Sequence, residues 1–179
     1  MCESCGMCCN GTLFNYVTLT SDDLPKLEKY TQLKLKIRNE QATFDEPCVL
    51  HTGTGCSAYE DRPGTCERYV CGVLRRVEKD ELTEEEALLV IKEGKALVEH
   101  VKEYVAFEPG MPIAVSTWEA PPEDISAEAK FAWERTAYHL GKWFLNTVKE
   151  EVEPAVPAAP PSGSPERAKV TRASLFAKR

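Results

Sequence analysis

The chain has 179 residues, of which 42% are hydrophobic, and a formal net charge of −7 at pH 7. This length usually gives one domain with at most an appendage, and the hydrophobic share allows a modest core. Residues 153–179 contain two acidic and five basic residues, so the part before them is more acidic than the whole chain. Because an acidic surface repels phosphate backbones, we expect no nucleic-acid partner.

We also expect no membrane partner, because no stretch approaches the roughly 18 consecutive apolar residues of a membrane span. The first residues, MCESCGMCC, lack the basic and apolar regions of a signal peptide. The expected location is therefore cytoplasmic, in a compartment where thiols stay reduced.

The first nine residues hold four cysteines in the pattern C-x2-C-x2-C-C, before any strand or helix is expected. A second group of four follows, and the eight predicted metal ligands are Cys2, Cys5, Cys8, Cys9, Cys48, Cys56, Cys66 and Cys71. Without an export signal, bunched C-x2-C pairs indicate a metal site more than disulfides. Thiolates two residues apart can bind one ion or one iron–sulfur cluster.

The sequence leaves two cofactors open, an iron–sulfur cluster and zinc. Three cysteines at C-x2-C-x2-C are the arrangement with which a short loop caps one face of a [4Fe–4S] cluster. Eight thiolates could also form two tetrahedral zinc sites. The adjacent Cys8 and Cys9 point their side chains apart, which makes it hard for both to bind one zinc ion. We therefore favour [4Fe–4S] over zinc.

In chain order, the β-branched and aromatic segment Phe14–Leu19 predicts a strand. A helix is expected over Leu24–Lys36, with Thr20 and Ser21 as N-cap candidates and Leu35 facing inward. Residues 41–71 are rich in Gly and Pro and predict a hairpin and loops.

The C-terminal part is expected to be helical. Thr83 and Glu86 form a capping box in the sequence, ahead of a helix that reaches Tyr104. A second helix begins near Ser126, with an apolar stripe formed by Trp133, Ala137, Leu140, Phe144 and Val148.

The predicted fold class is α+β: a small cysteine-rich, metal-bound domain with short strands and loops, then two long C-terminal helices and a disordered tail. Residues 1–78 form the metal-binding domain, residues 79–152 a helical part packed on it, and residues 153–179 a disordered, basic, Pro/Ala-rich tail.

Three further side chains near the second cysteine group are candidates for the site. Arg62 and Tyr59 can donate hydrogen bonds to thiolate sulfur and stabilise its negative charge. The alternative is that Arg62 pairs with Glu60 or Asp61 on the surface. His51 could ligate a metal, although a histidine in such a loop is more often solvated.

The segments CESCGMCC, LT-x2-D (Leu19 to Asp23) and Y-x2-RP-x2-C-x4-C (Tyr59 to Cys71) resemble the CxxCxxCC family of zinc- or iron-chelating domains, of the YkgJ type. The likeness covers residues 2–71. It implies a cysteine-cluster metal-binding protein. A related cluster occurs in flagellin lysine N-methylases.

Two functions follow as hypotheses. The first is a binding or electron-transfer module that holds the metal through up to eight thiolates, with a possible protein partner of unknown identity. The alternative is a group-transfer enzyme related to flagellin lysine N-methylase. The sequence shows no Gly-rich cofactor loop and no H-E-x-x-H motif, so whether the protein is an enzyme stays open.

Overall fold

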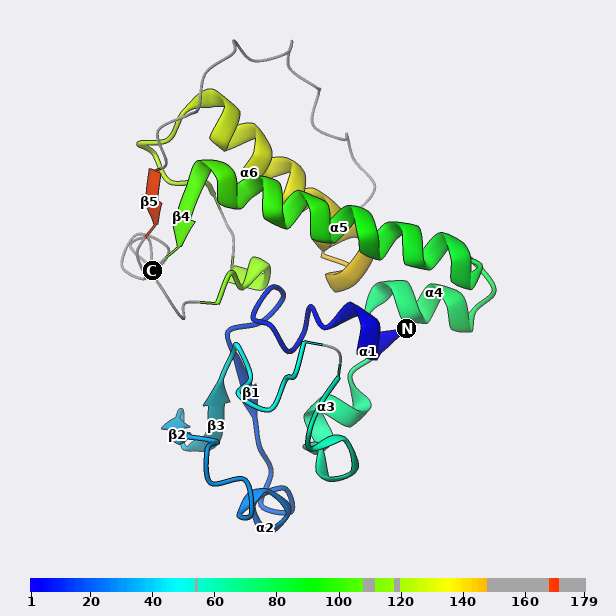
Figure 1. The fold of residues 1–179 in the computed structure, drawn as a ribbon, viewed down its shortest axis with the longest axis vertical. Coiled ribbons are helices and arrows are strands. Elements are labelled where there is room, and N and C mark those ends of the chain that lie inside the picture. The colour runs from blue at the N-terminus through cyan, green and yellow to red at the C-terminus, as the bar shows by residue number, and fades with distance from the viewer. Residues whose placement is uncertain (54, 108–111, 118–119, 148–167, 171–179) are drawn as a thin grey trace. The chain divides into compact units, whose positions relative to one another are not determined.

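The computed structural model describes residues 1–53, 55–107, 112–117, 120–147 and 168–170. The chain divides into two compact units (Figure 1). The first unit contains Met1–Val70 and Gly110–Ala114, and the second contains Cys71–Pro109 and Val115–Arg179. A small antiparallel sheet in the first unit and the helices of the second confirm the α+β class.

The sheet of the first unit has the order β1-β3-β2, with β1 at Tyr16–Thr18, β2 at Leu35–Arg38 and β3 at Gln41–Asp45. β1 and β2 both pair antiparallel with β3. The two-residue turn between β2 and β3 is Asn39-Glu40, and both residues have positive φ, as a tight hairpin requires. One face of the sheet buries a cluster formed by Val17, Leu19, Leu27 and Phe44.

The predicted helix over Leu24–Lys36 is wrong for most of its length. Only α2, Leu24–Leu27, is helical, and Leu35 lies exposed on strand β2. The hairpin turn explains the difference, because it pairs Leu35 with Phe44 of β3, a partner that local helix propensity does not include. The predicted strand at Phe14–Leu19 is confirmed in its centre, as β1.

The rest of the first unit consists of short helical turns. The N-terminal cysteines were expected in a loop, but Cys2–Cys5 forms the helical turn α1. In the predicted loop region, a 3-10 turn, η1, covers Tyr59–Asp61, and helix α3 covers Gly64–Arg68.

The second unit is built on α5, Glu84–Tyr104, which runs beside α6, Ala127–Leu140 (Figure 1). Of the two long helices predicted, α5 is long at 21 residues, whereas α6 has 14 and continues as a π-helical segment, η3, over Gly141–Leu145. Trp133, Leu140 and Phe144 of the predicted stripe are buried, and Val148 lies outside the described residues. The unit also contains α4 (Gly72–Glu78), β4 (Val105–Phe107) and η2 (Val115–Thr117).

The predicted capping box is confirmed at the start of α5. The backbone N–H of Glu86 donates to the Thr83 hydroxyl at 3.2 Å, and the Glu86 carboxylate accepts from the Thr83 backbone N–H at 2.8 Å. Side chains of α6 contact the backbone of α5. The Thr136 hydroxyl donates to Leu97 O at 3.2 Å, and His139 Nε2 lies 3.1 Å from Val90 O.

One strand lies within residues 153–179, the segment predicted to be a disordered tail, at Ala168–Val170. These residues form β5, which pairs in parallel with β4. The unpaired backbone of β4 offers N–H and C=O groups that a distant segment can satisfy. In the described part of the chain, no helix combines the length and apolarity needed to cross a membrane.

Candidate metal centre

The N-terminal cysteines lie on a compact double turn. Helix α1 ends at Gly6, whose φ of 67° is the left-handed conformation that glycine adopts without strain. The carbonyl of Gly6 then accepts from the N–H groups of Cys9 at 3.0 Å and Asn10 at 2.9 Å. The chain therefore folds back tightly between Cys5 and Cys9.

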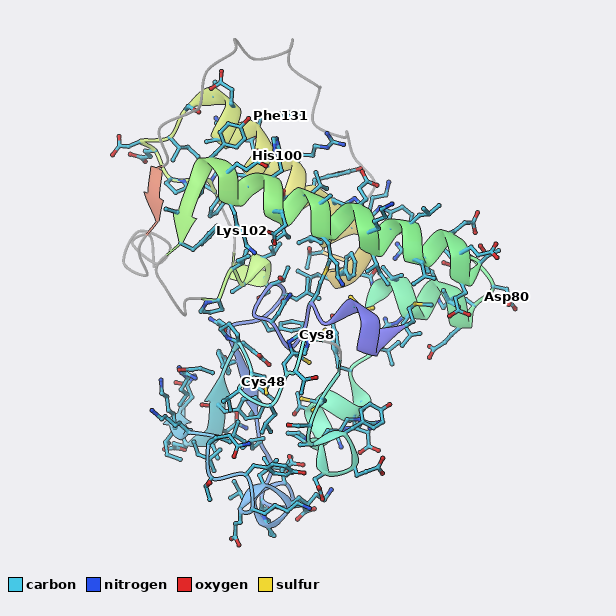
Figure 2. All side chains as sticks on the ribbon, in the orientation of Figure 1. Cys8, Cys48, Asp80, His100, Lys102 and Phe131 are labelled. Carbon is cyan, nitrogen blue, oxygen red and sulfur yellow. The ribbon has the colours of Figure 1, made fainter. Side chains whose placement is uncertain are left out.

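A backbone bond joins the first cysteine group to the second. The Cys48 N–H donates to Cys9 O at 2.8 Å, and Cys48 also packs against the buried cluster of the sheet. Figure 2 labels Cys48 and, on the N-terminal segment, Cys8. The His51 N–H donates to Cys48 O at 3.0 Å, and an isolated bridge pairs His51 with Cys56. Three cysteines from distant positions in the sequence are thus placed on neighbouring backbone.

Hydrogen bonds to residues in and near the sheet hold the helix that carries Cys66. It lies on α3, where the Gly64 N–H donates to the buried Asp23 carboxylate at 2.8 Å. The Thr65 hydroxyl donates to Thr18 O of β1 at 2.7 Å. Burial alone would raise the pKa of Asp23, but the bonds from Gly64 and Thr20 outweigh it and hold the pKa below its ordinary value.

The segment before α3 is held by contacts with Lys29 and Tyr30, which follow α2. Asp61 accepts a hydrogen bond from the Tyr30 hydroxyl at 2.7 Å and forms an ion pair with Lys29 at 2.7 Å. Arg62 donates to Tyr59 O at 2.9 Å, and its guanidinium lies 4.1 Å from the centroid of the Tyr59 ring. These contacts stiffen the turn, and the expected hydrogen bonds from Arg62 and Tyr59 to thiolate sulfur stay a prediction.

The thiols of the first unit act on one another electrostatically. Burial first, then the charges of Glu46, Cys48, Cys56 and Cys5, raise the pKa of Cys9 to about 12. Burial is also the main cause that raises the pKa of Cys48 to about 11. Without a cation, these thiols therefore stay protonated at neutral pH.

Cys66 belongs to the same group. The residue as a whole is exposed, yet protein atoms crowd around its sulfur. This burial, followed by the charges of Cys9, Glu46, Cys48 and Cys56, raises the pKa of Cys66 to about 12. Five thiols from three chain segments are thus close enough to sense one another: Cys5, Cys9, Cys48, Cys56 and Cys66.

The remaining predicted ligands are placed differently. Cys2 is exposed at the start of α1, and Cys8 is half-buried on the turn. Cys71 falls in the second unit, where its sulfur accepts from the Leu74 N–H at 3.4 Å as the N-cap of α4. The structure therefore gives Cys71 a local role in starting a helix.

Sequence reasoning missed Glu46. Its side chain is 4% exposed, and burial raises its pKa to about 8, although a backbone hydrogen bond from Cys48 opposes the shift. The only signal in the sequence was an acidic residue two positions before a cysteine. His51, for which a solvated position was the favoured interpretation, has a buried Nε2 without a hydrogen-bond partner among the described residues.

The donor set suits zinc or iron, because thiolate, imidazole and carboxylate are ligands of both. Buried polar atoms without partners beside the thiols also fit a metal at this place. Among the described residues, no three Cys, His, Asp or Glu side chains converge closely enough to hold one ion as they stand. Shared ligation therefore requires the side chains to rotate toward one another.

Comparison with known protein families gives a match over the N-terminal half of the chain. The family model CxxCxxCC, described as "Putative zinc- or iron-chelating domain", matches residues 1–90. No curated protein and no solved structure matches the chain significantly. The matched region contains all eight cysteines and about half of the chain. The protein therefore belongs to the CxxCxxCC family of zinc- or iron-chelating domains.

Proposed function

We propose that the protein is a cytoplasmic metal-binding module whose metal centre is held by cysteine thiolates of residues 1–78. The observation that carries this proposal is the group of five mutually interacting thiols, Cys5, Cys9, Cys48, Cys56 and Cys66. Buried thiols with raised pKa values repel one another when ionised, so an ionised group of this kind needs a cation.

The centre is an iron–sulfur cluster rather than zinc in this proposal, with [4Fe–4S] as the favoured form. The spacing C-x2-C-x2-C supports it, as does the tight turn at Gly6, which holds Cys5 and Cys9 on one short loop. Cys5 and Cys9 would be held by the N-terminal turn, with ligands from the second group completing the set. Cys2, Cys8 and Cys71 are further candidate ligands, and Arg62 and Tyr59 are candidate hydrogen-bond donors to sulfur.

When bound, such a cluster would supply one-electron transfer, which is the basis of the electron-transfer role that we propose. The chain itself contributes the positioning. The backbone bond between Cys9 and Cys48 and the Asp23–Gly64 bond hold the three cysteine-bearing segments in place. The low exposure of Glu46 and the partial burial of Cys9 and Cys48 would limit access of water.

The test is purification without oxygen, followed by metal analysis and an absorption spectrum. We expect brown protein that absorbs broadly near about 400 nm, contains iron and sulfide, and loses its colour in air. Colourless protein with stoichiometric zinc, after expression with ample iron, would refute the iron–sulfur assignment. Protein that retains neither metal would refute the metal-binding function.

The group-transfer alternative makes a separate prediction. An enzyme related to flagellin lysine N-methylase should bind S-adenosylmethionine tightly, which isothermal titration calorimetry on the metal-loaded protein measures directly. Reversible reduction of the centre with no such binding would favour the electron-transfer module.

A further inference from the structure

Glu46 is a buried acid that the cysteine pattern does not account for. It directly follows β3, and its backbone N–H donates to Asn15 O at 3.1 Å, which fixes the residue at the end of the sheet. The side chain is 4% exposed, and its Oε2 has no hydrogen-bond partner among the described residues. Buried polar atoms in native proteins are almost always paired, so this oxygen calls for a partner.

The thiols around Glu46 carry negative charge when they are ionised, as Glu46 does. Its charge acts on Cys9, Cys48 and Cys66, one thiol from each of the three converging segments. No ion pair among the described residues includes Glu46. A carboxylate and three thiolates without a cation between them would repel one another strongly.

A metal removes this conflict. A carboxylate oxygen is an ordinary ligand of zinc and iron and combines with thiolate sulfur in one coordination sphere. A hydrogen bond from water would satisfy Oε2 as well, and X-ray absorption spectroscopy distinguishes the two partners. The burial of Glu46 near three candidate ligands, with one carboxylate oxygen unpartnered among the described residues, therefore favours the metal as its partner.

We propose that Glu46 is itself a ligand of the metal centre, so that the donor set contains a carboxylate oxygen together with cysteine sulfurs. This inference rests on the proposed metal-binding function. It replaces an all-thiolate centre by a mixed one, and it assigns a ligand that lies outside the cysteine pattern.

The experiment is X-ray absorption spectroscopy on the full-length protein, loaded in separate preparations with zinc and with iron. A shell of oxygen or nitrogen atoms at about 2.0–2.2 Å should accompany the sulfur shell at about 2.3 Å. Glu46→Gln keeps the volume of the side chain but is a much weaker ligand, so it should reduce the shorter shell. Metal affinity, measured by competition with a chelator, should fall at least about tenfold, the lower end of the effect of losing a residue that supports a metal site.

Two further variants separate ligation from a general effect on folding. Glu60→Gln removes an exposed carboxylate of η1 in the same unit and should leave both measurements unchanged. Glu46→Asp keeps the carboxylate and should recover part of the affinity lost in Glu46→Gln.

The outcomes distinguish this inference from the function on which it rests. If the wild-type protein binds neither zinc nor iron, both are wrong. If it binds metal with a first shell of sulfur alone, or if Glu46→Gln matches the wild type in spectrum and affinity, only the role of Glu46 is wrong. If Glu46→Gln folds poorly, a wild-type first shell of sulfur alone still refutes the role of Glu46, and the metal affinity of Glu46→Asp still tests it.

Discussion

Replacing Asp23 by alanine should destabilise the first unit and release the helix that carries Cys66. The Asp23 side chain is 2% exposed and accepts three hydrogen bonds. One oxygen accepts from the Gly64 N–H at 2.8 Å, and the other accepts from the Thr20 N–H and hydroxyl, each at 2.8 Å. Alanine removes all three acceptor contacts at once.

The size of the effect follows from which donors are left unpaired. The bond to Gly64 is buried, and a buried N–H without an acceptor costs about 1–3 kcal/mol. The two donors of Thr20 are nearer to solvent, and losing a turn-capping acceptor typically costs about 1 kcal/mol. We therefore expect Asp23→Ala to lower the free energy of unfolding by about 2–4 kcal/mol.

The effect should also depend on pH. The pKa of Asp23 in the folded protein lies below its ordinary value of 3.8, because its three hydrogen bonds favour the charged form despite burial. Its contribution to stability is therefore fully present above about pH 4 and is lost as the pH falls through the lowered folded pKa. Asp23→Asn, which cannot ionise, should accordingly lose less stability than the wild type as the pH falls through this range.

Urea unfolding of the metal-loaded protein, followed at pH 7 and at several lower pH values, measures both effects. Asp22→Ala is the matched control, since Asp22 is exposed and the bond that it accepts from Ser21 is long, at 3.4 Å. The control should change stability by less than about 0.5 kcal/mol. The reasoning fails if Asp23→Ala and Asp22→Ala have the same midpoint, or if the loss in Asp23→Ala is unaccompanied by weaker metal binding.

Three further predictions concern the metal, the helical unit and the tail. Chelation or Cys5→Ser should unfold the first unit while α6 persists. Ordering the loop residues of this unit costs about 1–2 kcal/mol of conformational entropy each, which is more than the small core of the unit offsets without a metal. Equal hydrogen-exchange protection of the cysteine segments with and without metal would contradict this. Thr83→Ala should lower the free energy of unfolding by about 1 kcal/mol through loss of the N-cap. An unchanged midpoint of thermal unfolding would show that α5 does not depend on this cap. Truncation after Val152 should leave the metal content unchanged, since no cysteine follows Cys71, whereas loss of metal would place a tail residue at the centre.

Features fixed by neighbouring residues could be predicted from the sequence. The capping box of α5 needs only Thr83 and Glu86, three positions apart, and the buried stripe of α6 follows from helical spacing. The two cysteine groups were recognisable for the same reason, because ligand spacing is local.

Features that depend on distant partners could not be predicted. Leu35 became part of a strand because β3 pairs with it, and Ala168–Val170 became a strand because β4 offers an edge. The burial of Glu46 depends on three segments meeting around it, and neither its residue type nor its neighbours in sequence indicate this. Such features require the tertiary structure.

The residues that surround the cysteines explain how the candidate centre is supported. Asp23, the last residue of the LT-x2-D segment, accepts from Gly64 within the RP-x2-C segment, so the two segments form one hydrogen-bonded support for Cys66. The Cys9–Cys48 bond is a second, independent support. Breaking either one should displace a single ligand-bearing segment and leave the other two in place, because the two supports share no residue. Metal affinity should therefore respond to Asp23 even though its carboxylate is committed to the backbone of α3 and to Thr20.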